Sequence, residues 1–231
     1  MQWSLDGGGR WMIRDIIRTR KIQTILEIGV FLGGSVETWL ESSRRCTVLA
    51  VDTWPECNQP GQWDPSSFVE ENSDNIALAR QMRRESGFYN TFLANLWPHR
   101  ERVIPIRRSS PEVLYEMAEM GLHPDLIYLD SDKVGTELEI CHELFPGAIM
   151  SGDDWEFDPG AGYPIRAPVH RFCEKHALNV YVENASWVIA KSPLTFSYRY
   201  RLAKRRFYKQ RRKLKAQAIL AWDRLARRDA A

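Results

Sequence analysis

The sequence contains no apolar run that approaches the roughly 20 residues needed to span a membrane, and its N-terminus lacks the pattern of a secretory signal. These absences predict a cytoplasmic protein. The four cysteines form no CxxC pair, which argues against both a disulfide framework and a zinc ribbon. Reduced and mostly buried thiols are therefore expected. Internal repeats and low-complexity segments are also missing.

The 231 residues are 44% hydrophobic and 27% charged, a composition typical of a globular protein. This length fits one domain with an appendage. The formal net charge of +2 conceals an uneven distribution. Residues 199–231 contain 13 Lys and Arg and two Asp, whereas residues 1–198 contain 19 basic and 28 acidic residues. We therefore predict one domain over residues 1–197 and a basic helical tail over residues 198–231.

Short apolar runs of strand type alternate with helical patterns along the predicted domain. Strands are expected at residues 24–28, 47–51, 102–106, 125–129, 148–151, 178–183 and 186–191. Helices are expected at residues 33–41, 67–98 with a break near Gly87, 111–120 with Ser110 as N-cap, 134–144 and 165–176. The alternation predicts an α/β fold, namely a Rossmann-like, doubly wound, mostly parallel sheet of seven strands with helices on both faces.

Polar and glycine residues gather just after the predicted strands, where each strand ends. They are Gly29, Asp52, Ser109, Asp130 and Asp153. In an open α/β sheet the carboxyl ends of the strands form the edge at which ligands bind. The topology therefore predicts a binding site at this edge.

A glycine-rich turn joins the first predicted strand to its helix. Glycines let the backbone approach a ligand closely, and the helix N-terminus offers free N–H groups. The spacing is G-x-x-x-G-G, which differs from the G-x-G-x-x-G typical of dinucleotide binding. Asp52 ends the second strand, where its carboxylate can accept hydrogen bonds from both hydroxyls of a ribose. The alternative is that Asp52 caps a helix or faces solvent.

Together, the segments E-I-G-x-x-x-G-G-S at residues 27–35 and V-D-T-W at residues 51–54 resemble the cofactor motifs of class I S-adenosylmethionine-dependent methyltransferases. The resemblance implies that S-adenosylmethionine is the cofactor. It also implies a set of cofactor-binding residues: Glu27, Gly29, Gly33 and Ser35 around the methionine end, Asp52 and Thr53 at the ribose, and Ser109 or Ser110 near the adenine.

Carboxylates follow the fourth and fifth predicted strands, which are expected to be neighbours. Asp130 follows the fourth strand, and Asp153 and Asp154 follow the fifth. Adjacent strands lie ~4.8 Å apart, so these side chains can converge on one cation. Oxygen ligands without histidine or cysteine suit a hard ion, with Mg²⁺ first and Mn²⁺ or Ca²⁺ after it. The alternative is that some of them cap the following helices.

The same two segments resemble a narrower group, the macrocin-type sugar O-methyltransferases and cephalosporin-hydroxylase-like proteins. The shared patterns are D-L-I-x-x-D-x-D at residues 125–132 and P-G-x-I-x-x-G-D-D-W at residues 146–155, and the likeness extends over about residues 20–191. The resemblance implies that Asp130, Asp153 and Asp154 are the metal ligands. The sequence departs from the group at Ser131 and Lys133, where those proteins usually have glycine and histidine.

Asp130-x-x-Lys133 is in turn similar to catechol O-methyltransferase, in which a lysine lies near the reacting hydroxyl. The resemblance implies a metal-bound substrate hydroxyl that loses its proton to Lys133, or else to Asp132 or a metal-bound water, and then attacks the sulfonium methyl group. The alternative is that Lys133 only screens the acidic cluster. Trp54 and Trp63, in a loop after the second strand, could stack on the acceptor or pack the loop onto the domain.

The expected activity is therefore metal-dependent O-methylation of a small molecule, such as a sugar, a natural product or a catechol-like compound. An NAD-dependent oxidoreductase is disfavoured by the spacing of the glycines. A third interpretation is a binding module whose altered site no longer catalyses and whose basic tail contacts RNA or an anionic membrane. The tail could also pack on the acidic domain or join two copies of the chain.

Overall fold

The computed structural model describes residues 10–57, 59, 64–73, 75–131, 135–158, 160, 162–201, 203, 204 and 207. The chain divides into two compact units, Met1–Ser192 and Pro193–Ala231. The predicted division at residue 197 stays a prediction. In the second unit, residues 196–201 are helical, and most of the predicted tail lies outside the described residues. Within the described parts of the chain, no helix is long and apolar enough to cross a membrane.

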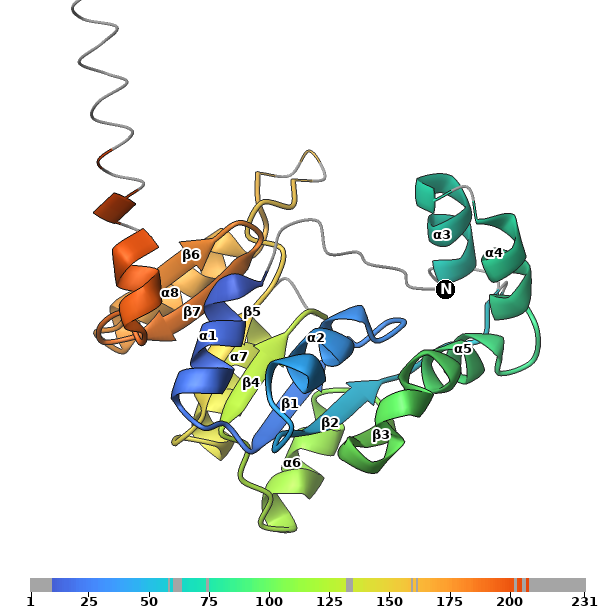
Figure 1. Cartoon of the computed structure of the whole chain (residues 1–231), viewed down its shortest axis with the longest axis horizontal. Helices are drawn as coiled ribbons and strands as arrows, with labels where there is room; N and C mark the ends of the chain where they lie inside the picture. The colour runs from blue at the N-terminus through green and yellow to red at the C-terminus, as the bar shows by residue number, and fades with distance from the viewer. Residues whose placement is uncertain are drawn as a thin grey trace, which may run out of the picture. The chain divides into compact units, whose positions relative to one another are not determined.

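The first unit is built around one seven-stranded sheet (Figure 1). Its strands are β1 (Thr24–Ile28), β2 (Thr47–Asp52), β3 (Val103–Arg107), β4 (Leu126–Leu129), β5 (Ile149–Gly152), β6 (Asn179–Glu183) and β7 (Ser186–Ala190). The order across the sheet is β3-β2-β1-β4-β5-β7-β6. Strands β1 to β5 are parallel, whereas β7 runs antiparallel to both β5 and β6. The predicted α/β fold with a mostly parallel seven-stranded sheet is confirmed.

Helices connect the strands in the described part of the chain. They are α1 (Trp11–Thr19), α2 (Gly34–Ser42), α3 (Pro65–Ser73), α4 (Ile76–Met82), α5 (Gly87–Leu96), η1 (Trp97–Arg102), α6 (Glu112–Glu119), α7 (Thr136–Leu144) and α8 (Arg166–Lys175). The helical stretch expected at residues 67–98 is three helices and the start of η1, and its predicted break does fall at Gly87. Ser110 is not the N-cap of α6, because that helix begins at Glu112 with Pro111 as its cap. Helix α1 was not predicted.

The two faces of the sheet differ in polarity because successive side chains of a strand point to opposite sides. Leu26 and Ile28 of β1 belong to a large apolar core that includes residues of α6, α7 and α8. On the other face, Glu27 lies beside Tyr128 of β4 in the parallel register, and both contact Trp39 of α2. A row of buried polar groups therefore runs across the sheet beneath α2, one residue before the carboxyl edge.

Candidate functional site

The glycine-rich turn between β1 and α2 needs both of the glycines that the sequence singled out. Gly29 has φ +84°, and a Cβ atom there would lie 2.5 Å from the carbonyl oxygen of Asp130. Gly33 has φ +87° as the N-cap of α2, and a Cβ atom there would lie 2.8 Å from the Leu96 side chain. The left-handed conformation and the close approach both exclude larger residues. The turn thereby lies directly against the chain that leaves β4.

Asp52, at the end of β2, is hydrogen-bonded to this turn. Its Oδ2 accepts the backbone N–H groups of Val30 and Phe31, both at 2.9 Å, and its Oδ1 accepts that of Trp54 at 2.8 Å. Burial raises the pKa of Asp52, and these N–H groups oppose the rise. A carboxylate has about four acceptor positions, so little capacity remains for a ribose. The contact of Asp52 and Thr53 with the cofactor stays a prediction.

Trp54 packs the loop after β2 onto the domain. Its side chain is fully buried against Tyr89 and Phe92, and its indole N–H donates to the Phe31 carbonyl at 2.9 Å. Of the two roles considered for this residue, the structure therefore supports packing. Trp63, for which the same two roles were considered, lies outside the described residues.

Glu27 and Ser35 form a buried polar contact beneath the turn. The Ser35 hydroxyl and the Trp39 indole both donate to the Glu27 carboxylate, the latter at 2.6 Å. Glu27 has no solvent exposure, and burial raises its pKa to about 7, although these two bonds and Arg10 oppose the rise. The carboxyl group therefore fastens the first turns of α2 to β1. Whether Glu27 or Ser35 also reaches a cofactor stays a prediction.

The two serines after β3 lie in different surroundings. The Ser109 hydroxyl is exposed and donates to the Ser110 carbonyl at 3.3 Å. The Ser110 hydroxyl is buried and has no hydrogen-bond partner among the described residues. A buried hydroxyl without a partner is costly. The contact of Ser109 or Ser110 with the cofactor stays a prediction.

The predicted acidic cluster is brought to one edge of the sheet, as expected. The backbone N–H of Asp130 donates to the Ile28 carbonyl at 2.9 Å, and that of Asp153 donates to the Leu129 carbonyl at 3.1 Å. These bonds continue the β1–β4–β5 ladder past the strand ends. Asp154, next to Asp153, has a left-handed backbone with φ +63°. The predicted catalytic residues Asp132 and Lys133 lie outside the described residues.

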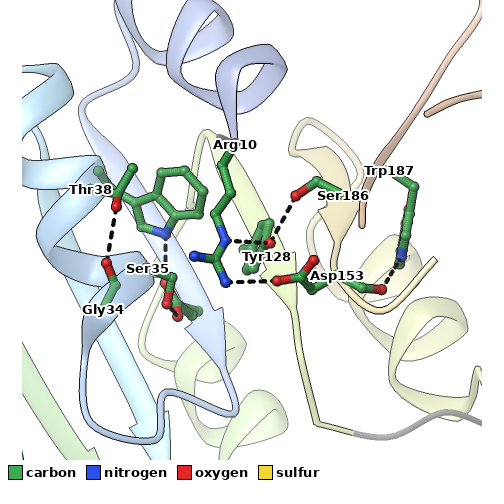
Figure 2. A network of polar contacts seen from close by, with 10 residues as sticks. Arg10, Gly34, Ser35, Thr38, Tyr128, Asp153, Ser186 and Trp187 are labelled. Atoms are coloured by element: carbon green, nitrogen blue, oxygen red, sulfur yellow. Dashed lines mark hydrogen bonds and ion pairs between the residues drawn. The ribbon is translucent and has the colours of Figure 1, made fainter. Parts of the chain in front are cut away.

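Asp153 has a partner that sequence reasoning missed. Its Oδ2 accepts a hydrogen bond from the Arg10 guanidinium at 2.7 Å, and Arg10 also donates from Nε to the Tyr128 hydroxyl at 3.1 Å (Figure 2). The other carboxylate oxygen of Asp153 is buried and has no hydrogen-bond partner among the described residues. Arg10 precedes α1, and no sequence signal connects it to a residue 143 positions away.

These contacts bear on whether a metal fits. Asp153 uses one oxygen for Arg10, and its other oxygen is enclosed. In the described ranges, no group of three or more His, Cys, Asp or Glu side chains is arranged to hold a metal ion. As arranged, Asp153 is engaged by Arg10, and the assignment of Asp130, Asp153 and Asp154 as metal ligands stays a prediction.

Neither a protein-family model nor a curated protein matches the sequence. Solved structures do match the fold. A "putative caffeoyl-CoA O-methyltransferase" from Staphylococcus aureus has a TM-score of 0.54 and 13% identity, with 78% of this chain and 81% of that chain covered. A SAH-bound methyltransferase from Podospora anserina has a TM-score of 0.50 and 18% identity, with 78% and 76% covered. Cofactor-bound Rv0187 from MTB has a TM-score of 0.50 and 15% identity, with 78% of each chain covered. The first unit therefore shares its α/β fold with these three proteins.

Proposed function

We propose that this protein transfers a methyl group from S-adenosylmethionine to a hydroxyl group of a small molecule. The observation that carries the proposal is the carboxyl edge of the sheet. There the turn at Gly29 lies against Asp130, Asp52 is hydrogen-bonded to the same turn, and the fold is that of known methyltransferases. The O-methyltransferase and the SAH-bound methyltransferase among the structural matches support this choice of cofactor and reaction.

The described residues suit a cofactor with a cationic sulfonium and a positively charged amino group. The turn itself is uncharged and offers backbone N–H groups at the start of α2. The acidic side chains at this edge, Asp130 among them, favour the positive amino group. Methyl transfer then needs the acceptor oxygen held in line with the methyl carbon, and much of the rate comes from that positioning.

Metal dependence stays a prediction from the sequence and is not part of this proposal. A bound Mg²⁺ or Mn²⁺ would lower the pKa of an acceptor hydroxyl and fix its orientation, and Asp130, Asp153 and Asp154 are the residues expected to hold it. Because Asp153 is paired with Arg10, we derive no step through a metal. Removal of the acceptor proton by Lys133 or Asp132 stays a prediction.

The first experiment is a calorimetric titration of S-adenosylmethionine into the full chain, followed by a screen of sugars and catechol-like acceptors. We expect micromolar affinity, which Asp130→Asn should weaken together with methyl transfer. The matched control is Asp125→Asn, at the opposite end of β4, which should keep the activity. No cofactor binding would refute the proposal and favour the binding module.

The basic C-terminal segment supports a separate role in binding. Among its described residues, Phe196, Tyr200 and Phe207 are exposed and alternate with Arg199, Arg201 and Lys204. We propose contact with an anionic surface, either RNA or a membrane, and self-association through this helix is the other candidate. Binding to RNA or anionic vesicles that weakens steeply with salt would support the first, and a dimer in analytical ultracentrifugation would support the second.

A further inference from the structure

We infer that the Arg10 guanidinium takes the position of a cation at Asp153, so that divalent metal ions must compete with this arginine for the carboxylate. The ion pair is short, at 2.7 Å, and both side chains are largely enclosed, with exposed fractions of 15% for Arg10 and 11% for Asp153. Surface ion pairs are easily exchanged, but a buried pair is replaced only if both charges stay neutralised. The inference concerns cation binding and does not depend on methyl transfer.

Arg10 is fixed from several sides. Its Nε donates to the Tyr128 hydroxyl, which lies 3.2 Å from the Ser186 hydroxyl on β7. The guanidinium carbon lies 6.0 Å from the Trp39 ring centre and 5.9 Å from that of Tyr128. Aromatic faces stabilise a cation at such distances. The guanidinium is thus preorganised at Asp153 by groups from α2, β4 and β7 (Figure 2).

The backbone of Asp153 is also held in place. Its N–H donates to the Leu129 carbonyl, and its own carbonyl accepts the Trp187 indole N–H at 2.9 Å. Trp187 packs so closely over the preceding Gly152 that a Cβ atom there would collide with the indole. The backbone of Asp153 is therefore fixed at a position from which its side chain reaches the guanidinium.

A metal ion at Asp153 would meet an unfavourable field. An arginine in a protein keeps its charge at every relevant pH, so the guanidinium cannot make room by losing a proton. A divalent ion beside it would be repelled at short range in a partly desolvated site. The Oδ1 of Asp153 is enclosed, so it is not open to an ion that arrives from solvent. We therefore expect the wild-type chain to bind Mg²⁺ and Mn²⁺ weakly.

The test is Mn²⁺ binding to the full chain, followed by the electron paramagnetic resonance signal of free Mn²⁺. Arg10→Gln removes the competing charge and should bind Mn²⁺ at least tenfold more tightly than the wild type. The matched control is Arg14→Gln, on the helix α1 that follows Arg10, because Arg14 donates to Ser42 instead. This variant should bind Mn²⁺ as the wild type does. Adding Asp153→Asn to Arg10→Gln should remove the gain.

Two results would overturn the inference. One is equal Mn²⁺ affinity in the wild type and Arg10→Gln, and the other is a gain that persists after Asp153→Asn. Arg10→Gln leaves a buried carboxylate unpaired and could unfold. A second measurement therefore uses the wild type, with Asp153→Asn as its control. The melting temperature of the wild type should be the same in millimolar MgCl₂ as in NaCl of equal ionic strength. A rise in MgCl₂ that Asp153→Asn abolishes would show that the metal binds despite Arg10, against the inference.

Discussion

Glu27 should make the stability of this protein depend on pH near neutrality. The carboxyl group is fully buried between β1 and α2, and burial raises its pKa to about 7 from an ordinary value of 4.5. Glu27→Gln keeps the size of the side chain and cannot ionise. Its amide oxygen can accept the Trp39 N–H, and its NH₂ group can donate to the Ser35 hydroxyl. The variant therefore imitates the protonated form of Glu27.

The direction of the effect follows from proton binding. Between pH 4.5 and 7 the unfolded chain has lost the Glu27 proton while the folded chain retains it, so the folded state loses stability as the pH rises. The slope is at most about 1.4 kcal/mol per pH unit, which amounts to about 3 kcal/mol by pH 8. Below pH 4.5 both states are protonated, and the effect disappears. Glu27→Gln should thus equal the wild type near pH 4.5 and be about 3 kcal/mol more stable at pH 8.

Urea unfolding at half-unit steps from pH 4.5 to 8, with the difference between variant and wild type taken at each pH, measures this directly. Taking the difference cancels every other titrating group that the two proteins share. The control is Glu41→Gln, an exposed position on the same helix α2, which should give a nearly constant difference. A constant difference for Glu27→Gln as well would refute the reasoning, because the carboxyl group would then titrate alike in both states.

Three further substitutions test the site. Gly29→Ala should destabilise the protein by about 3 kcal/mol in urea unfolding and abolish cofactor binding, because the turn requires a positive φ and leaves no room for Cβ; Gly147→Ala, with open space around it, is the control. Asp52→Asn should lower the free energy of unfolding by about 1–3 kcal/mol, because the new NH₂ group faces backbone N–H donors. Calorimetry should also show weaker cofactor binding, and an unchanged unfolding free energy would contradict this prediction. Trp187→Phe should lower the unfolding free energy by about 1 kcal/mol through loss of the hydrogen bond from the indole to the Asp153 carbonyl. The control is Trp155→Phe, because the Trp155 indole does not donate to that carbonyl.

The sheet was predictable because its signals are local. Strands β1, β4 and β5 are short apolar runs followed directly by a glycine or an aspartate, β2 ends in Asp52, and parallel strands place these residues at one edge. The strand bounds differ from the predicted ones by at most one residue at either end. Helix α1 had a signal of the same kind, since Met12, Ile13, Ile16 and Ile17 are spaced as one helical face and are all buried. It was missed although the pattern was readable.

The helical pattern after β2 was predicted as one stretch with a single break, and this prediction was incomplete for a different reason. A periodic pattern over residues 67–98 does not by itself show where the chain turns. Asn75 caps α4 with its side chain, and Ser86 has a left-handed backbone before α5. The break at Asn75 was missed although an asparagine is a recognisable N-cap, whereas the break before α5 was predicted near Gly87. Tertiary contacts, such as the bond from the Ser86 N–H to Glu56, fix that turn.

The polar part of the site shows the limit of sequence reasoning most clearly. The sequence places Asp130, Asp153 and Asp154 at one edge, and from like charges alone one infers a missing cation. A metal ion is one solution, but an arginine from anywhere in the chain is another, and sequence spacing does not distinguish them. Here the counter-charge is Arg10, which reaches Asp153 because α1 packs beside α2 and β7. A cluster of acidic residues is therefore evidence only that a positive charge lies nearby. Whether that charge is a metal ion or an arginine depends on a long-range contact, which the fold alone decides.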